Sequence, residues 1–158
     1  MLKFEEFDFL SADGRTKIYV KGILPEDDIK GCVQIAHGIA EHSERYTAFM
    51  SFLAENGYAV FANDHLGHGK SVASEEDRGF FAEEDGWNIA VKDMKTLHDI
   101  LKERFPEVPA FLFGHSMGSF LSRTYIIDYP QDKKGAILCG TGQQSPIIVA
   151  IGKKLAEK

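Results

Sequence analysis

Residues 110–118 read Ala-Phe-Leu-Phe-Gly-His-Ser-Met-Gly, and this stretch decides the predicted fold. An apolar, strand-like run leads directly into a G-x-S-x-G pentapeptide, and a helical pattern follows it. This is the pattern of a nucleophile elbow, a sharp strand-to-helix turn that exposes a serine hydroxyl. We therefore expect Ser116 to be a nucleophile, with Gly114 and Gly118 keeping side chains out of the tight turn.

Away from this turn, short apolar runs alternate with longer amphipathic ones, which is typical of a parallel sheet covered by helices. Residues 3–22 alternate in hydrophobicity around Asp13-Gly14, which predicts an antiparallel hairpin at one edge of the sheet. Strands are predicted at 32–36, 58–62, 110–113 and 135–139, and helices at 45–55, 86–105, 117–129 and from 146 onward. The predicted fold class is α/β, with helices on both faces of the sheet.

Composition excludes several classes of protein. The 158 residues carry a net charge of -6 and no basic stripe, so we expect no nucleic-acid partner. No segment approaches the roughly 18 apolar residues of a membrane-spanning helix, and residues 1–6 are too charged for a signal peptide, which predicts a cytoplasmic protein. Cys32 and Cys139 each lie in an apolar strand-like run and are expected to be packed free thiols.

A second polar run, His37–Tyr46, reads His-Gly-Ile-Ala-Glu-His-Ser-Glu-Arg-Tyr and directly follows the predicted strand 32–36. Gly38 allows the backbone to turn, so that the N–H of Ile39 can face the same cavity as the N–H of Met117. Two such donors would form an oxyanion hole. The other candidates that shape this loop are His37, Glu41 and His42, although the two histidines could simply be satisfied by backbone groups.

A third run, residues 63–71, reads Asn-Asp-His-Leu-Gly-His-Gly-Lys-Ser after the predicted strand 58–62. Asp64 could be a triad acid, but in folds built on this elbow the acid follows the serine. We therefore expect Asp64, His65 and His68 to shape a hydrogen-bonded turn beside the site, and His115 to be structural too. A metal site on His37, His42, His65 and His68 is disfavoured, because none of them has the carboxylate or cysteine spacing of a zinc site.

Together and in this order, the three runs resemble the monoacylglycerol lipase and lysophospholipase branch of the α/β-hydrolase superfamily, the serine aminopeptidase S33-like hydrolases. Ala40 and Ser119 are minor departures, at positions where the family often has glycine. The resemblance implies an esterase acting on monoacylglycerols, lysophospholipids or similar carboxylic esters, with Ser116 as nucleophile and the N–H groups of Ile39 and Met117 as oxyanion hole. It implies no cofactor and is compatible with transient membrane contact. Peptidase activity stays open, because the same groups serve amides.

Chain length is the large departure from that family. The sequence ends at Lys158 and has no histidine after His115, whereas family members continue into a cap and two further strands that deliver the acid and the histidine. We expect residues 1–144 to be a partial α/β-hydrolase core and residues 145–158 to begin a helical cap. The chain alone is then expected to be inactive, and strand 135–139 to be an open sheet edge that favours self-association.

Three hypotheses remain open at this point. The favoured one is an N-terminal portion of a lipase-like serine hydrolase. In the second, the chain is a non-catalytic binding or assembly module that uses its exposed sheet edge. In the third, His37, His42, His65 or His68 serves Ser116 as base within a rewired enzyme.

Overall fold

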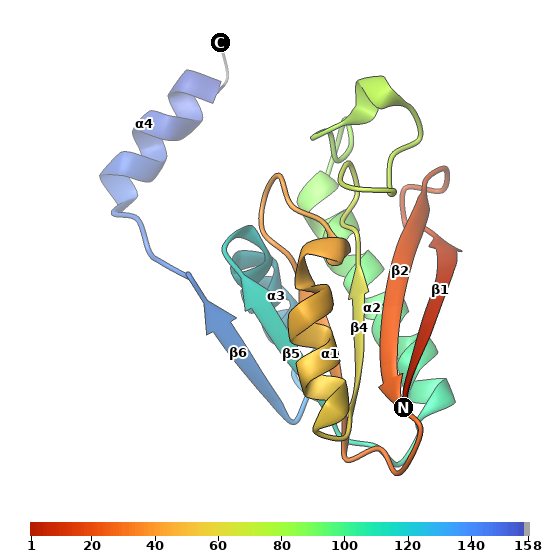
Figure 1. Cartoon of the computed structure of the whole chain (residues 1–158). Coiled ribbons are helices and arrows are strands. Elements are labelled where there is room, and N and C mark those ends of the chain that lie inside the picture. The colour runs from red at the N-terminus through yellow and green to blue at the C-terminus, as the bar shows by residue number, and fades with distance from the viewer. Residues whose placement is uncertain (157–158) are drawn as a thin grey trace.

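A mixed sheet of six strands crosses the molecule in the order β1-β2-β4-β3-β5-β6 (Figure 1). The computed structural model describes residues 1–156 of the chain. The strands are β1 (Leu2–Leu10), β2 (Lys17–Pro25), β3 (Gly31–Ala36), β4 (Tyr58–Asn63), β5 (Ala110–His115) and β6 (Gly135–Cys139). β1, β2 and β4 pair antiparallel, whereas β4, β3, β5 and β6 run parallel. The predicted α/β class and the hairpin at one sheet edge are confirmed.

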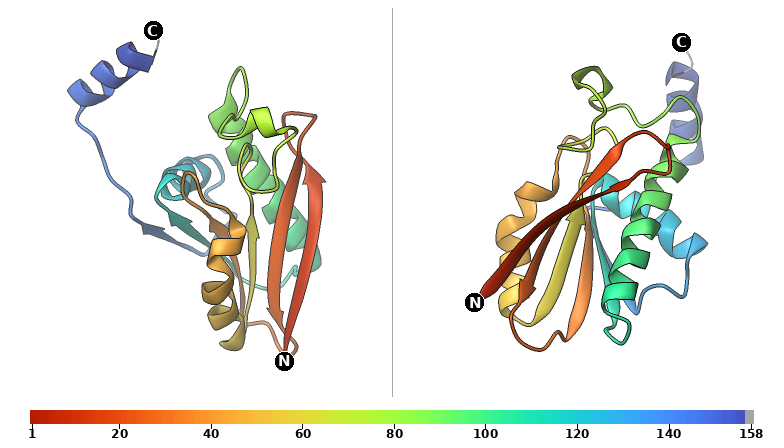
Figure 2. Two further views of the ribbon diagram at one scale, coloured as in Figure 1. Left: turned by 45° about the horizontal axis from the view of Figure 1, so that its top comes forward. Right: turned by 90° about the vertical axis from the view of Figure 1, so that its right-hand side faces the viewer.

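Helices cover the two faces of this sheet. One face carries α1 (Thr47–Glu55), and the other carries α2 (Gly86–Arg104) and α3 (Met117–Asp128) (Figure 2). Two short 3-10 turns, η1 (Ser43–Tyr46) and η2 (Glu75–Asp77), lie in the loops. The apolar stripe of α2 is buried at helical spacing, because these side chains face the sheet and α3. Its members are Ala90, Val91, Met94, Leu97 and Leu101.

The strand order brings three loops to one edge of the sheet. The chain passes from β3 through α1 to β4, and then returns through α2 to β5 on the other side of β3. The carboxyl ends of these three parallel strands are therefore neighbours, at the position where ligands bind in open α/β sheets. All six residues of β3 are buried, because this strand lies between β4 and β5 with helices on both faces of the sheet.

Strand β6 forms the far edge of the described sheet, and its surface is open. Ile137 is 64% exposed there. The prediction that both cysteines are packed is right for Cys32 but wrong for Cys139, which is exposed. The reason is position, because β6 has a strand neighbour on one side only. Burial raises the pKa of the Cys32 thiol to about 11.

The predicted helix from residue 146 is present as α4 (Pro146–Ala156), which stands away from the sheet (Figure 1). The Ile148 N–H donates to Ser145 Oγ at its start. Its large apolar side chains are exposed, namely Ile147, Ile148, Val149, Ile151 and Leu155. No helix within residues 1–156 combines the length and apolarity needed to span a bilayer. The division into a core, 1–144, and a cap, 145–158, stays a prediction, and its last two residues lie outside the described part.

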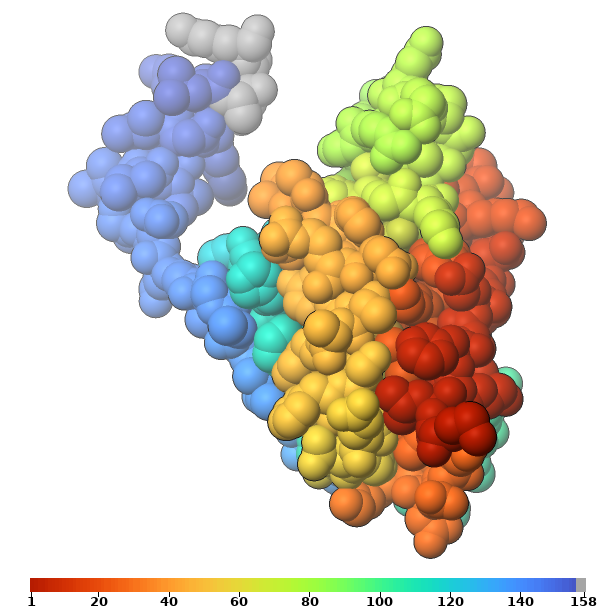
Figure 3. All heavy atoms as spheres, in the orientation of Figure 1, coloured from red at the N-terminus to blue at the C-terminus, as the bar shows by residue number. Residues whose placement is uncertain are grey.

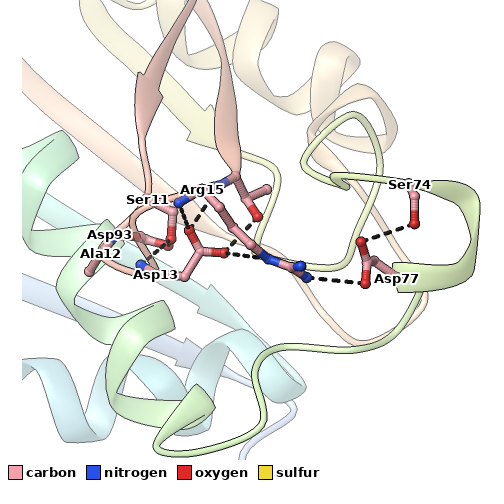
Figure 4. Close-up of polar contacts among 8 residues, drawn as sticks. Ser11, Ala12, Asp13, Arg15, Ser74, Asp77 and Asp93 are labelled. Carbon is pink, nitrogen blue, oxygen red and sulfur yellow. Dashed lines mark hydrogen bonds and ion pairs between the residues drawn. The ribbon is translucent and has the colours of Figure 1, made fainter.

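The tip of the β1–β2 hairpin is fastened to two other parts of the fold (Figure 4). The Asp93 carboxylate on α2 accepts hydrogen bonds from Ser11 Oγ at 2.8 Å and from the Ala12 N–H at 2.7 Å. Arg15 reaches the other way and pairs with Asp77 in η2 at 3.1 Å. Burial raises the pKa of Asp93 to about 6, although both hydrogen bonds oppose the shift.

A first prediction concerns Asp93→Asn. Because the pKa of Asp93 is higher in the folded chain than its ordinary 3.8, the folded state keeps the proton longer. Ionisation of Asp93 therefore lowers the free energy of unfolding as pH rises from about 4 to about 6. Asn cannot ionise, so the variant should gain about 1–3 kcal/mol relative to the parent between about pH 4 and about pH 7. Urea unfolding of both proteins at the two pH values measures this gain, and a pH-independent difference would contradict it.

Candidate functional site

The serine of the elbow sits in a conformation that few non-glycine residues adopt. Ser116 joins β5 to α3 with φ 51° and ψ -120°. Its N–H donates to the Cys139 carbonyl at the end of β6, at 2.9 Å. Its own carbonyl accepts the Ser119 hydroxyl at 2.6 Å. The strained turn is thus held by a neighbouring strand and by the first turn of the following helix.

The two glycines of the motif allow this turn to pack against β3. A Cβ on Gly118 would lie 2.0 Å from the Ala36 carbonyl oxygen. A Cβ on Gly114 would lie 2.4 Å from Ser122 Oγ and 2.6 Å from the Gly118 carbonyl. Both positions therefore need glycine for space, and not for a left-handed backbone.

The second predicted loop lies directly against the serine. A Cβ on Gly38 would be 3.2 Å from Ser116 Cβ, so the two backbones approach closely. The His37 ring is fully buried beneath the loop, with Nδ1 at 2.7 Å from the Gly38 carbonyl. Ile39 and Ala40 are exposed at the loop's crest, and Ala40 adopts a φ of 57°.

Glu41 connects this loop to the elbow. Its Oε2 atom accepts the Gly38 N–H at 3.0 Å and the Tyr46 hydroxyl at 2.7 Å. The Tyr46 hydroxyl also lies 3.0 Å from His115 Nδ1, which places His115 in a structural contact. Burial raises the pKa of Glu41, but the hydrogen bonds from Tyr46 and Gly38 outweigh it, so the net pKa is lowered.

The third loop forms the expected hydrogen-bonded turn. Asp64 Oδ1 accepts the Ser43 N–H at 2.6 Å, and Oδ2 accepts the Lys70 N–H at 2.8 Å. The His65 N–H donates to His37 Nε2 at 2.9 Å, and the His68 N–H donates to the His65 carbonyl. By accepting hydrogen bonds from these two backbone N–H groups, Asp64 links the segment at Ser43 to the loop after β4. This is a structural role for the carboxylate.

Three histidine rings cluster beneath the site, tilted relative to one another. The His37 and His65 centroids lie 4.3 Å apart, and those of His37 and His68 lie 5.4 Å apart. Burial lowers the pKa of His37 to about 4 and that of His65 well below its ordinary value. Both rings are therefore neutral near pH 7. His42, in contrast, is exposed on the loop surface.

A cavity of about 660 Å³ opens beside the loop. Figure 3 shows the hollow between the orange segment near residue 40 and the yellow-green segment near residue 78. Ile39 and Met117 contribute to its wall, together with Phe80 and Phe81 from the loop after β4. Phe80 and Phe81 were not predicted as site residues, because their loop has no periodic pattern or motif.

These residues can do part of an acyl-transfer reaction. Ser116 offers a hydroxyl, and Met117, as the first residue of α3, lies where backbone N–H groups lack intrahelical partners. Within residues 1–156, no hydrogen bond joins Ser116 Oγ to a histidine, and no group of three or more His, Cys, Asp or Glu side chains is arranged to hold a metal ion. The motif pattern alone could not reveal the hydrogen bond from Tyr46 to Glu41 or the one from Ser119 to the Ser116 carbonyl.

Comparison with known proteins finds sequences similar to this chain. Residues 27–157 match the family model described as serine aminopeptidase, S33. The monoacylglycerol lipase of Mycolicibacterium smegmatis is 33% identical over 91% of the chain and 51% of its own length. The monoglyceride lipase of Rattus norvegicus is 32% identical over 89% of the chain and 43% of its own length. The chain thus spans about half the length of the curated relatives it matches.

Solved structures of similar proteins share this fold. A thermostable carboxyl esterase from Bacillus coagulans, in complex with glycerol, superposes with a TM-score of 0.84 at 34% identity. A lipase in an open form superposes with a TM-score of 0.85 at 31% identity. Each match covers 98% of this chain and 50% of the other one.

A second prediction tests the packing of the elbow. Gly118→Ala should lower the free energy of unfolding by about 1–3 kcal/mol, because the new methyl group meets the rigid backbone of β3. Gly142→Ala is the control, since a Cβ there meets nothing within 4 Å, and its effect should stay within about 0.5 kcal/mol. Urea unfolding measures both. Equal stability of the two variants would contradict the close approach of elbow and strand.

Proposed function

The chain belongs to the serine aminopeptidase S33 family, and on this premise we propose that it carries the nucleophile and oxyanion hole of a serine hydrolase that cleaves carboxylic esters. The observation that carries the proposal is the close approach of two loops. Ser116, in its strained turn, lies against Gly38 at the start of the Gly38–Ile39 peptide. A nucleophile and two convergent backbone donors are the core of acyl-transfer sites.

In the proposed reaction, Ser116 Oγ attacks the ester carbonyl carbon and loses its proton to a base. The carbonyl oxygen becomes an oxyanion that accepts hydrogen bonds from the N–H groups of Ile39 and Met117. Collapse of this intermediate expels the alcohol and leaves an acyl group on Ser116, which water then removes. The serine hydroxyl is a weak nucleophile without the base.

The base, in our proposal, comes from outside these 158 residues. His37 is the histidine nearest the proposed oxyanion loop, but its two ring nitrogens already face the Gly38 carbonyl and the His65 N–H. His68 Nδ1 lies 3.1 Å from the Leu66 carbonyl. These contacts disfavour His37 as the base, and within residues 1–156 no hydrogen bond joins Ser116 Oγ to His42, His65 or His68. Hydrolysis by the chain alone should then be slow, because triad members act as a unit.

The cavity beside Ile39 and Met117 is our candidate for the acyl site. Its wall carries the apolar side chains of Phe80 and Phe81, as an acyl chain requires. The names of similar proteins, monoacylglycerol lipase and carboxyl esterase, support an ester of a small alcohol as substrate. A peptidase is the runner-up, because the family model is described as an aminopeptidase and the same groups can attack amides.

A third prediction uses an external base. With added imidazole, p-nitrophenyl butyrate should acylate Ser116 of the intact chain, because imidazole can take the Oγ proton that no nearby histidine accepts. Intact-mass spectrometry detects the added butyryl group, and Ser116→Ala is the matched control that should gain none. The analogous butyryl p-nitroanilide should acylate the chain more slowly if the site favours esters.

The outcomes of that experiment separate the hypotheses. Acylation of Ser116 without imidazole would favour a base within the chain. A folded chain that stays unmodified with and without imidazole would contradict the proposed nucleophile and favour the binding module.

We also propose that two copies associate through β6. This strand has an unpaired edge in the described sheet, and such edges pair readily with another chain. Ile137 on the same strand presents apolar surface, with 64% of its area exposed. Transient membrane contact and a cytoplasmic location stay predictions.

The fourth prediction tests this association. Ile137→Lys should weaken it by about tenfold or more, because a lysine at the edge loses apolar burial and repels its symmetry mate. Ile127→Lys is the matched control, since Ile127 is 76% exposed on the helix α3 and not on the edge strand. Sedimentation equilibrium measures both. A parent chain that remains monomeric at all concentrations would contradict the proposal.

A further inference from the structure

One peptide group beside the elbow is held from its carbonyl side. The carbonyl of Gly38 and the N–H of Ile39 belong to the same peptide unit. In a trans peptide these two groups point in opposite directions, so the direction of the carbonyl sets that of the N–H. The Gly38 carbonyl oxygen lies 2.7 Å from His37 Nδ1. The contact between His37 Nδ1 and the Gly38 carbonyl therefore also determines the direction of the Ile39 N–H.

The tautomer of His37 is determined by its second contact. Nε2 lies 2.9 Å from the backbone nitrogen of His65, which can only donate. Nε2 must therefore carry a lone pair, and the ring proton must sit on Nδ1. In that tautomer Nδ1–H donates to the Gly38 carbonyl. Through these two hydrogen bonds, the ring connects the end of β4 to the loop after β3.

The surroundings keep this ring uncharged. Burial lowers the pKa of His37 to about 4, and the nearby His68 ring acts in the same direction. The Gly38 carbonyl and the carboxylates of Asp64 and Glu41 act in the opposite direction and are outweighed. The ring therefore keeps a lone pair on Nε2 at every pH well above about 4.

We propose that His37 is a positioning residue for the oxyanion hole, which orients the Ile39 N–H through its hydrogen bond to the Gly38 carbonyl. This inference rests on the proposed function, because it assigns a purpose to the Ile39 donor. Glu41 contributes from the other side by holding the Gly38 N–H at 3.0 Å. That bond, however, fixes the preceding peptide unit. Among the described residues, His37 is the one whose side chain bonds the unit that carries the Ile39 N–H.

The first test uses the unaltered chain. In a ¹⁵N-labelled sample, the imidazole nitrogen resonances of His37 should report a protonated Nδ1 and an unprotonated Nε2 between about pH 5 and about pH 8. A protonated Nε2 in this range would overturn the proposal, whatever the variants do. This test needs neither catalysis nor a substrate.

The second test compares two variants. In His37→Asn the side-chain amide nitrogen can take the place of Nδ1 and donate to the Gly38 carbonyl. In His37→Gln the longer side chain carries its amide to the place of Nε2, and the Gly38 carbonyl loses its donor. The residual dipolar coupling of the Ile39 N–H, which reports its direction, should be kept in the first variant and altered in the second. Couplings in β3 and β4 are the internal reference.

Failure of this inference can be told apart from failure of the proposed function. With imidazole present, acylation of Ser116 should fall about 10²-fold in His37→Gln, as when an oxyanion donor is lost, and much less in His37→Asn. An unchanged Ile39 coupling in a folded His37→Gln chain would overturn the positioning role. If the coupling is altered in His37→Gln but neither the parent chain nor the variants are acylated, the positioning role of His37 stands. The proposal of an ester hydrolase would then be refuted instead.

Discussion

The backbone of Ser116 adopts a φ of 51°, and the neighbouring elements of the described fold stabilise this turn. A non-glycine residue there costs of order 1–3 kcal/mol, and it persists only when its surroundings determine it. The Cys139 carbonyl of β6 and the Ser119 hydroxyl of α3 supply the restraints. Gly118, pressed against β3, allows the helix to start there without a clash. Strain at one residue is therefore balanced by contacts from three elements.

A second constraint comes from the polar groups buried beneath the turn. Buried donors and acceptors are costly when unpaired. Most of the polar groups at the ends of β3 and β4 are paired, although His65 Nε2 and Asn63 Oδ1 have no hydrogen-bond partner within residues 1–156. His37 accepts the His65 N–H, and Asp64 accepts two backbone donors from other segments. The loops after these strands are thus locked together before any ligand is considered. A site formed in this way is rigid because its hydrogen bonds have few alternatives.

Much of this could be predicted from the sequence. The period of apolar residues gave α2 within one residue, and the alternation around Asp13-Gly14 gave the hairpin. The place of β4 between β2 and β3 could not be predicted, because it depends on how the helices pack across the sheet. The exposure of Cys139 was missed even though strand 135–139 was expected to be an open edge, because an apolar run alone does not show which of its side chains are covered. The tautomer of His37 depends on a backbone donor 28 residues away, which no local pattern encodes.

In our proposal, the elbow and the loop after β3 form an oxyanion hole that is ready before a ligand binds. The most direct measurement is a crystal structure of the chain with Ser116 phosphonylated by an alkyl fluorophosphonate in the presence of imidazole. If the two donors form the oxyanion hole, the phosphoryl oxygen should lie about 2.7–3.1 Å from the backbone nitrogens of both Ile39 and Met117. An adduct whose phosphoryl oxygen points to solvent, with the loop around Gly38 displaced, would contradict it.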